Sequence, residues 1–459
     1  MLTQLLKPEI KALIDERKLS TLKEVLRDWS PTDIAQLISE APENDQAIIF
    51  RLLSHDLAAD TFEYLELDIQ VSLLKAMGKE EVANILNEMA PDDRTALFED
   101  LPSAAAKQLI MLLSAEERKI ATTLLGYPED SVGRLMTPDY IDVKPEWTIK
   151  EVLDFVRVNG KDSETLNIIY VIDDKGKLID DLRIREILLA PLDKKVLDLM
   201  DENFVALHVA DDQETAVNVF KKYDRIALPV VDQSGVLIGI VTVDDMLDVA
   251  EEEATEDIHK IGGVEALEES YSTISLFSMM KKRAGWLALL FVGEMFTATA
   301  MGFFENEISK AIVLTLFLPL IISSGGNSGS QAATLVIRAI SLGEITLRDW
   351  LFVLRREIIT GLLLGSVLAV IGFLRISVWQ VTAHVYGLHW LVVALTVSFS
   401  LIGVVLWGTF AGAMLPIILK KLGADPATSS APLVATLVDV TGLIIYFSVA
   451  QIILKGTLL

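Results

Sequence analysis

Glu294 and Asp439 stand out chemically, because each is a carboxylate inside a long apolar segment. Lipid penalises an intramembrane charge by about 3 kcal/mol or more, so both side chains are expected to face a bundle interior or a water-filled path. Asp439 lies in TLVDVTG, where hydroxyl-bearing and small neighbours indicate a hydrated lining. The alternative for both residues is an interhelical hydrogen bond that only holds the bundle together.

A glycine-rich segment, SSGGNSGSQ at residues 323–331, follows Leu318-Pro319 without any charge. This pattern predicts an interrupted span whose freed carbonyls, amides and hydroxyls could line an ion path. Small-residue helix packing is the alternative. Oxygen donors with one carboxylate per chain suit a largely hydrated Mg²⁺ rather than a thiophilic metal. The candidate lining residues are Gly325, Gly326, Asn327 and Gln331.

The charge of the chain is unevenly distributed. The 459 residues carry a net charge of −25 and are 51% hydrophobic; residues 1–280 hold 28 basic and 57 acidic side chains (−29), and residues 281–459 hold 12 and 8 (+4). The acidic part argues against nucleic acid as a partner and favours cations. The absence of cysteine excludes disulfides, thiolate metal sites and cysteine nucleophiles, and the five scattered histidines argue against a histidine-built zinc site.

Five apolar segments in residues 281–459 are long enough to span a bilayer. The N-terminus has no long apolar run, so no cleaved signal peptide is expected and the acidic part should stay cytoplasmic. With the N-terminus inside, nine Lys/Arg flank the inner ends and three the outer ends, which satisfies the positive-inside rule and puts the C-terminus outside. The spans are expected near 284–303, 311–337, 352–374, 391–418 and 432–454.

Residues 30–125 form eight consecutive blocks of twelve, with apolar positions 5, 8, 9 and 12 on one helical face. Each block is predicted to be a short helix and a turn, so residues 1–130 should form an α-solenoid. The acidic block starts, such as Asp92-Asp93, are interpreted as ordinary helix N-terminal charges. A cation site there would need a partner surface.

Residues 131–250 contain a tandem repeat, with copies at 131–195 and 196–250. VIDDKGKLIDDLRIREIL (171–188) aligns without gaps to VVDQSGVLIGIVTVDDML (230–247), and each copy is read as strand, glycine turn, strand and helix start. An acidic connecting helix is expected at 251–280. Its carboxylates should repel the acidic surface that precedes it unless divalent cations lie between them, which would make the pair a switch.

The tandem repeat resembles a pair of CBS domains, which bind adenine nucleotides in their clefts. The second copy keeps the expected Gly239, Thr242 and Asp245. In the first copy Asp180 replaces the glycine, Arg183 the hydroxyl and Glu186 the ribose-binding aspartate. The resemblance therefore implies ATP binding at one cleft at most, with Thr242 and Asp245 as the candidate ligands.

The order of the parts, together with stretches such as SGGNSGSQAATLVIRAI and DPATSSAPLVATLVDVTGLIIYF, resembles the MgtE family of magnesium transporters over nearly the whole chain. The resemblance implies a homodimeric, Mg²⁺-gated channel with its pore between subunits. It assigns Asp439 to the pathway, Asp425 to the pore mouth and residues 325–331 to a pore turn. Where the family often has asparagine, this chain has Ala431, whose backbone carbonyl could still serve. The implied cytosolic Mg²⁺ ligands are Asp93, Asp212, Glu214, Asp224, Asp245, Asp248, Glu253 and Glu256.

The sequence therefore predicts a multidomain membrane protein: an α-solenoid, a tandem CBS α/β pair, a connecting helix and a five-helix all-α transmembrane domain at 281–459. The expected function is Mg²⁺ import across the cytoplasmic membrane, shut off by cytosolic Mg²⁺. The alternatives are a broader Co²⁺/Mn²⁺ transporter and a membrane-tethered CBS nucleotide sensor. An enzyme is not expected, because no nucleophile–base pair or phosphate loop appears.

Overall fold

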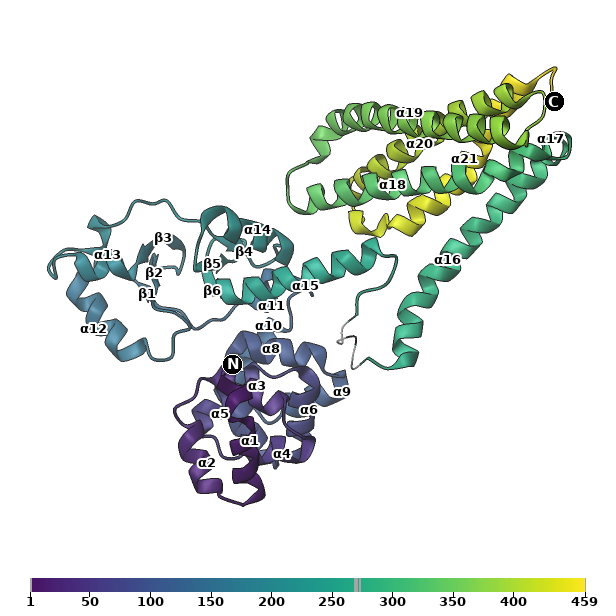
Figure 1. Ribbon diagram of the computed structural model, residues 1–459. Coiled ribbons are helices and arrows are strands. Elements are labelled where there is room, and N and C mark those ends of the chain that lie inside the picture. The colour runs from purple at the N-terminus through teal and green to yellow at the C-terminus, as the bar shows by residue number, and fades with distance from the viewer. Residues whose placement is uncertain (1, 268–270, 272–273, 459) are drawn as a thin grey trace. The chain divides into compact units, whose positions relative to one another are not determined.

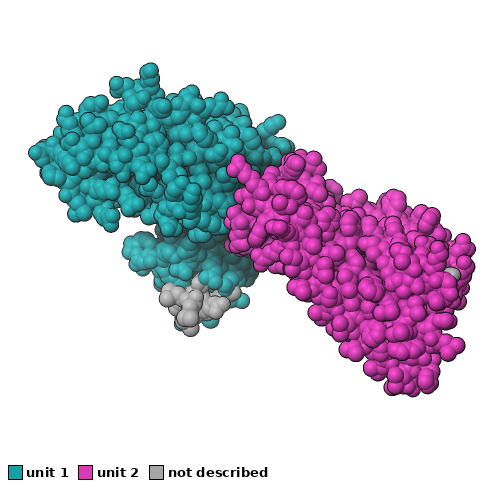
Figure 2. Space-filling view, turned by 90° about the horizontal axis from the view of Figure 1, so that it is seen from above, with its two compact units in different colours: residues 1–250 teal, residues 251–459 magenta. Residues whose placement is uncertain are grey.

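The computed structural model describes residues 2–267, 271 and 274–458 (Figure 1). The chain forms two compact units, residues 1–250 and residues 251–459 (Figure 2). Each unit has hydrophobic cores of its own.

The first unit begins with the predicted solenoid. Each twelve-residue block contains one helix, and the apolar faces of these helices build a shared core around Ile34, Phe62 and Leu86. Ser30 and Ser114 begin their helices by accepting hydrogen bonds from the backbone N–H groups of Asp33 and Glu117. The helices are α1 (Leu2–Asp15), α2 (Leu19–Leu26), α3 (Pro31–Ser39), α4 (Glu43–Phe50), α5 (His55–Glu63), α6 (Leu67–Ala76), α7 (Lys79–Glu88), α8 (Pro91–Asp100), α9 (Ser103–Ile110) and α10 (Ala115–Leu124).

The tandem module consists of two similar α/β copies. In each copy a short strand pairs in parallel with a longer one, which pairs antiparallel with the third, so the sheet orders are β1-β2-β3 and β4-β5-β6. Gly176 and Gly235 have φ values of +79° and +82° in the equivalent turns, as the sequence alignment predicts. The elements are α11 (Val132–Leu135), β1 (Asp142–Val143), α12 (Ile149–Asn159), β2 (Ile168–Ile172), β3 (Leu178–Arg183), α13 (Ile184–Leu189), η1 (Val196–Asp198), β4 (Leu207–His208), α14 (Gln213–Tyr223), β5 (Ala227–Val231) and β6 (Leu237–Thr242).

The connecting helix differs from the prediction at both ends. Helix α15 (Val243–Ile261) already begins inside the second copy of the tandem module, and it ends well before residue 280. Gly263 ends it, because its φ of +71° is a left-handed conformation that glycine adopts readily, and the N–H of Val264 turns back to the carbonyl of His259. Part of the expected helix, residues 268–270 and 272–273, lies outside the described residues.

Among its described residues, the second unit contains five helical segments long and apolar enough to cross a membrane, which agrees with the predicted number. They are Leu276–Phe303, Ile312–Ser341, Leu347–Ala383, Trp390–Lys421 and Ala431–Leu454. Their helices are α16 (Leu276–Phe303), η2 (Ile312–Phe317) with α18 (Leu318–Ser341), η3 (Leu347–Asp349) with α19 (Trp350–Ala383), α20 (Trp390–Lys421) and α21 (Ala431–Leu454); α17 (Glu305–Lys310) and η4 (Pro426–Thr428) lie in connections. The solenoid, the small sheets and these helices together confirm the predicted fold class.

Helices α18, α20 and α21 form the packed centre of the second unit (Figure 1). Val404 of α20 and Val438 of α21 are fully buried between them. Helix α16 packs mainly on α21, and none of its side chains is buried within the protomer.

Candidate cation sites

Asp439 lies in the middle of α21, half-buried in the membrane unit. A Cβ atom at Gly326 of α18 would be 3.6 Å from Oδ1 of Asp439, so a glycine backbone lines this carboxylate on one side. No described residue hydrogen-bonds to the Asp439 carboxylate, and Glu294 is the charged neighbour that acts on it. An intramembrane carboxylate without a hydrogen-bond partner in its own protomer is suited to hold a cation or its water shell.

A polar stripe on α18 accompanies Asp439. Ser323, Asn327 and Gln331 recur every fourth residue, and all three are exposed in the protomer. Asn327 Nδ2 donates to Ser323 Oγ at 3.4 Å, so these side chains lie on one face of the helix. Amides facing lipid would be unsatisfied, so this stripe must meet water, an ion or another protein surface.

The glycine-rich segment is not a turn, and this part of the prediction is wrong. Residues 323–331 lie inside the continuous helix α18. A Cβ atom at Gly325 would be 2.4 Å from Val404 Cγ1, and one at Gly329 would be 3.0 Å from the Gly408 carbonyl oxygen. Small-residue packing therefore accounts for Gly325 and Gly329, since α20 approaches α18 too closely for a side chain. Of the predicted lining, Asn327 and Gln331 are exposed, whereas Gly326 is buried beside Ala435 and Asp439.

Ala431 and Asp425 are found at the start of α21 and in the preceding connection. The Ala431 carbonyl accepts a hydrogen bond from Ser330 Oγ at 3.0 Å, in addition to its place in the first helical turn. That carbonyl is therefore engaged by the protein, contrary to its expected role as a ligand. Asp425 Oδ1 caps η4 by accepting from the Ala427 N–H at 2.8 Å, while Oδ2 accepts from Lys260 at 2.7 Å.

Glu294 is exposed on α16, on the helix that leaves all its side chains outside the protomer core. Its neighbour Gly293 lies against α21, where an added Cβ would be 2.8 Å from Thr436 Cγ2. A third carboxylate, Glu357, was missed by the sequence analysis. It lies on the spanning helix α19, directly after Arg356, whose charge acts on it.

In the first unit, carboxylates from distant parts of the chain converge where α8 meets the tandem module. Asp92 and Asp93 begin α8, Asp244 and Asp245 begin α15, and Glu164 precedes β2. Burial raises the pKa of Asp93 to about 8, and repulsion from Glu63 and Asp245 adds to this. Burial likewise raises the pKa of Glu164 to about 7 and that of Asp245 to about 6. Asp92 is buried, and its pKa is raised well above its ordinary value for the same reason.

This acidic cluster contains two of the predicted ligands, Asp93 and Asp245. It also contains Asp92, which the sequence indicated only as a helix N-terminal charge, and two residues that the sequence did not indicate, Glu63 and Glu164. A cation site at Asp92-Asp93 was expected to need a second acidic surface, and Glu63, Glu164 and Asp245 supply it. Among the described residues, no three carboxylates or histidines are close enough to form a ready-made metal site. A cation there would be held partly through its own water molecules, which is the usual state of protein-bound Mg²⁺.

The other predicted cytosolic ligands lie at the two ends of α14 and along α15. Asp212 caps the start of α14, where it accepts from the Glu214 N–H at 3.0 Å. Asp224 ends the same helix in a left-handed conformation with φ of +48°. Eleven helical residues separate these ends by about 16 Å, so they cannot share one ion. Asp248 acts electrostatically on Asp245, and Glu256 pairs with Lys260 at 2.5 Å. Glu253 follows on the same helix, within the second unit.

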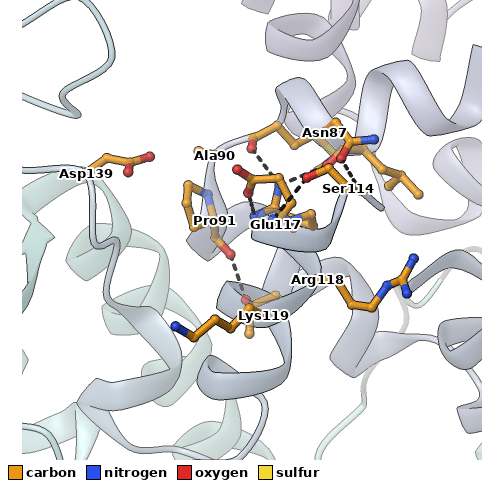
Figure 3. A network of polar contacts seen from close by, with 12 residues as sticks. Asn87, Ala90, Pro91, Ser114, Glu117, Arg118, Lys119 and Asp139 are labelled. Carbon is orange, nitrogen blue, oxygen red and sulfur yellow. Dashed lines mark hydrogen bonds and ion pairs between the residues drawn. The ribbon is translucent and has the colours of Figure 1, made fainter. Parts of the chain in front are cut away.

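Arg94 fixes the orientation of α8 from inside the solenoid. Its side chain is fully buried, pairs with Glu117 of α10 and donates to the Leu86 carbonyl at 3.0 Å. The surrounding contacts continue through Ser114, whose N–H donates to Asn87 Oδ1 at 2.8 Å (Figure 3). Because a buried guanidinium with fixed partners cannot rotate away without large cost, Asp92 and Asp93 are held at the surface facing the tandem module.

The acidic cluster makes the stability of the first unit depend on pH. Carboxyl groups whose pKa is raised by folding bind protons more tightly in the folded state, so stability is complete below about pH 4 and falls as pH rises through about 6 to 8. Each group contributes about 1.4 kcal/mol per pH unit within its window. We expect the melting temperature of a fragment of residues 1–262 to fall between pH 5.5 and pH 8.5 in EDTA.

Mg²⁺ should reverse that fall, and should do so more at pH 8.5 than at pH 5.5, because it replaces the lost protons. Calorimetry with and without 10 mM Mg²⁺ measures both effects. Asp93→Asn should flatten the pH dependence, whereas Asp33→Asn, at a partly exposed carboxylate near the start of α3 and outside the acidic cluster, is the control. A pH-independent melting temperature would contradict the assignment of these raised pKa values.

The fold and the sites define a multi-pass membrane protein with an acidic first unit and a carboxylate within a membrane-spanning helix. Comparison with family models matches residues 318–449 to a divalent cation transporter family, MgtE, residues 29–130 to the MgtE intracellular N domain, and residues 132–193 and 196–252 to the CBS domain. Two curated relatives bear the name magnesium transporter MgtE. That of Thermus thermophilus is 36% identical over 450 residues, covering 97% of this chain and 98% of that protein. That of Bacillus subtilis is 31% identical over 440 residues, covering 95% of each. The chain belongs to the MgtE family.

Two solved structures resemble the first part of the chain. One is the cytosolic domain of the Mg²⁺ channel MgtE in complex with ATP, at 34% identity and a TM-score of 0.51, covering 53% of this chain and all of that one. The other is the soluble part of a magnesium transporter, at 26% identity and a TM-score of 0.52, covering 55% of this chain and 99% of that one. These matches place the solenoid and the CBS pair in the same fold as the soluble parts of magnesium transport proteins.

Proposed function

We propose that this protein is a Mg²⁺-selective channel that imports Mg²⁺ across the cytoplasmic membrane and closes when Mg²⁺ fills its acidic cytosolic sites. The observation that carries the proposal is Asp439, an intramembrane carboxylate with no hydrogen bond from any described residue and with the polar stripe of α18 nearby. The names of the relatives support Mg²⁺ as the ion. The lining contains oxygen and amide donors and no thiol, as a hard cation requires.

The proposal includes a homodimer with the ion path between two copies. Ser323, Asn327 and Gln331 support it, because they are exposed in one protomer and lipid would leave them unsatisfied. A second copy would also cover Glu294 on α16. The basic flanks of the spans support an N-terminus in the cytoplasm and a C-terminus outside.

Closure is proposed to follow from charge neutralisation in the first unit. The raised pKa values of Asp93, Glu164 and Asp245 reflect burial and mutual repulsion, which a divalent cation relieves more effectively than one proton. Mg²⁺ would therefore favour the arrangement in which α8 and α15 approach each other. A ligand shifts such an equilibrium only by its different affinity for the two arrangements, and the converging carboxylates provide that difference.

No role is derived for ATP, although a relative was crystallised with it. Thr242 Oγ1 donates to Asp245 Oδ2 at 2.6 Å, so the two candidate ligands engage each other. In the first copy, the buried Asp180 carboxylate accepts from the N–H groups of Asp201 at 2.8 Å and Glu202 at 3.0 Å. That carboxylate is engaged by the backbone where the second copy has Gly239, which supports a nucleotide at one cleft at most.

Ion flux in proteoliposomes tests the function. The full-length protein should admit Mg²⁺, and the flux should stop when Mg²⁺ on the side of the first unit reaches millimolar concentration. A protein lacking residues 1–130 loses Asp92 and Asp93 and should keep conducting at that concentration. Equal closure of both proteins would argue against the sensor. Equally rapid entry of Co²⁺ or Mn²⁺ would show a broader transporter, and no entry of any divalent cation would show that the chain is not a channel.

A further inference from the structure

In the last turn of α15, Lys260 pairs with Asp425, a carboxylate in the connection between α20 and α21. Lys260 Nζ lies 2.7 Å from Asp425 Oδ2 and 2.5 Å from Glu256 Oε1, so one ammonium group joins two carboxylates. The Lys260 side chain is 24% exposed and that of Asp425 36%, so the contact is partly shielded from water. All three residues belong to the second unit.

Further contacts hold this end of α15 in place. Asp257 accepts a hydrogen bond from Ser341, the last residue of α18, at 2.9 Å. Ile261 packs on the main core of the membrane unit, and an added Cβ at Gly263 would be 3.2 Å from Pro432 of α21. These contacts fix the end of α15, so the Lys260 ammonium is held beside Asp425 by the helix backbone as well as by its own side chain.

The local charges show what this ammonium does. Glu256, Asp257 and Asp425 contribute three negative charges and Lys260 one positive charge, which leaves the site at −2. Burial alone would lower the pKa of Lys260, but its hydrogen bonds to Asp425 and Glu256 outweigh this effect and raise it. The lysine therefore stays charged, and it occupies the same oxygen that a cation entering at Asp425 would use.

We propose that Lys260 is a tethered cation that occupies Asp425 while the end of α15 is docked, and that it must leave before a divalent cation can use this carboxylate. The inference rests on the proposed function, and it adds Asp425 to the proposed ion path. In the docked position, the Lys260 ammonium competes with the transported ion for the Asp425 carboxylate, in addition to any steric obstruction by the helix. Undocking of α15 frees Asp425 and removes a positive charge from the path at the same time.

The full-length protein in liposomes tests this proposal through the Mg²⁺ concentration that half-closes the channel. Lys260→Met keeps the apolar stem and removes the charge. Half-closure should then require about five-fold more Mg²⁺, a shift of the size expected when one partly exposed ion pair is lost. Lys260→Arg keeps the charge and should close like the unmodified protein. Lys281→Met, on an exposed lysine of α16, is the matched control and should not shift closure.

Three results would overturn the inference. If Lys260→Met closes at the same concentration as the unmodified protein, the ammonium does not hold the closed form. If Lys260→Arg shifts closure as much as Lys260→Met, the position acts through packing and its charge is irrelevant. If the unmodified protein carries no Mg²⁺ at all, the proposed function fails and the inference fails with it, a result separate from the other two.

A second measurement holds the end of α15 in its docked position and then removes the Lys260 charge. The chain contains no cysteine, so Asp257→Cys with Ser341→Cys introduces a single pair of thiols at positions whose side chains now share a hydrogen bond. Cross-linking them with a short bifunctional thiol reagent should lock α15 and stop flux even in low Mg²⁺. In the same locked protein, Lys260→Met should restore part of the flux. Full block regardless of residue 260 would contradict the competition between lysine and ion.

Discussion

Replacing Asp439 with alanine is expected to reduce Mg²⁺ flux by at least two orders of magnitude. Asp439 is half-buried in α21, and no described residue hydrogen-bonds to its carboxylate. A cation in the middle of a span needs a compensating charge, and one charge at that depth is worth about 3 kcal/mol, a factor of about 100 in occupancy. Flux is measured with a Mg²⁺ indicator inside proteoliposomes.

The series Asp439→Asn, Asp439→Glu and Asp439→Ala separates charge from shape. Asparagine keeps the size and loses the charge, so it should conduct as poorly as alanine. Glutamate keeps the charge and should retain measurable flux. Glu344→Ala, on an exposed carboxylate after α18, is the control and should conduct normally. Undiminished flux in Asp439→Ala, with normal folding, would remove Asp439 from the ion path.

Gly412→Ala is expected to be the most damaging single-methyl change in the membrane unit. A Cβ atom at residue 412 of α20 would be 2.1 Å from the Gly329 carbonyl oxygen and 2.8 Å from its carbonyl carbon. Both are backbone atoms of α18, so they cannot swing away as a flexible side chain can. The helices must separate, and overpacking of this kind costs about 1–3 kcal/mol or more.

Thermal unfolding in detergent, followed by fluorescence-detected gel filtration, measures that cost. Gly412→Ala should lower the melting temperature by several degrees or prevent recovery of the folded protein. Gly302→Ala is the matched control, because an added Cβ there meets no atom within 4 Å. As a residue inside α16, Gly302 should tolerate alanine or gain stability from its higher helix propensity. Equal stability of the two variants would refute the close packing of α18 on α20.

The solenoid and the five spans were predictable because their signals are local. Each twelve-residue block has its own apolar face and its own helix start, so every predicted block contains one helix. The spans follow from length and apolar composition alone. The two glycine turns of the tandem module follow equally from the gapless alignment, since Gly176 and Gly235 occupy the same position in each copy.

The glycine-rich segment shows where composition alone is ambiguous. Glycine permits a turn, and it also permits two helices to touch, so the residues themselves do not distinguish an interrupted span from a packed one. Spacing does distinguish them. Gly325 and Gly329 are four residues apart, as are Gly408 and Gly412, and this spacing places each pair on one helical face. Close packing could therefore have been predicted from the sequence.

The acidic cluster was not predictable as a whole, because its members are far apart in the chain. Asp92 and Asp93 are adjacent in the sequence. Glu63 reaches them only when the solenoid folds, where it accepts a hydrogen bond from the Ala90 N–H at 2.9 Å, and Glu164 reaches them only when α8 packs on the tandem module. The pairing of Lys260 with Asp425 joins residues 165 positions apart for the same reason. Side chains like these carry no local pattern, since each one alone looks like an ordinary solvated charge.

The interlocked glycines of α18 and α20 also limit how the membrane unit can move. Sliding one helix along the other would drive the backbone at Gly408 and Gly412 into that of Gly325 and Gly329, which they already approach without room for a methyl group. Shear between these helices is therefore blocked, and α18 and α20 act as one stiff body. The mobile parts must lie at its margins, so opening should be a hinge movement of this body as a unit, with helix α16, which buries no side chain in the protomer, as the deformable edge.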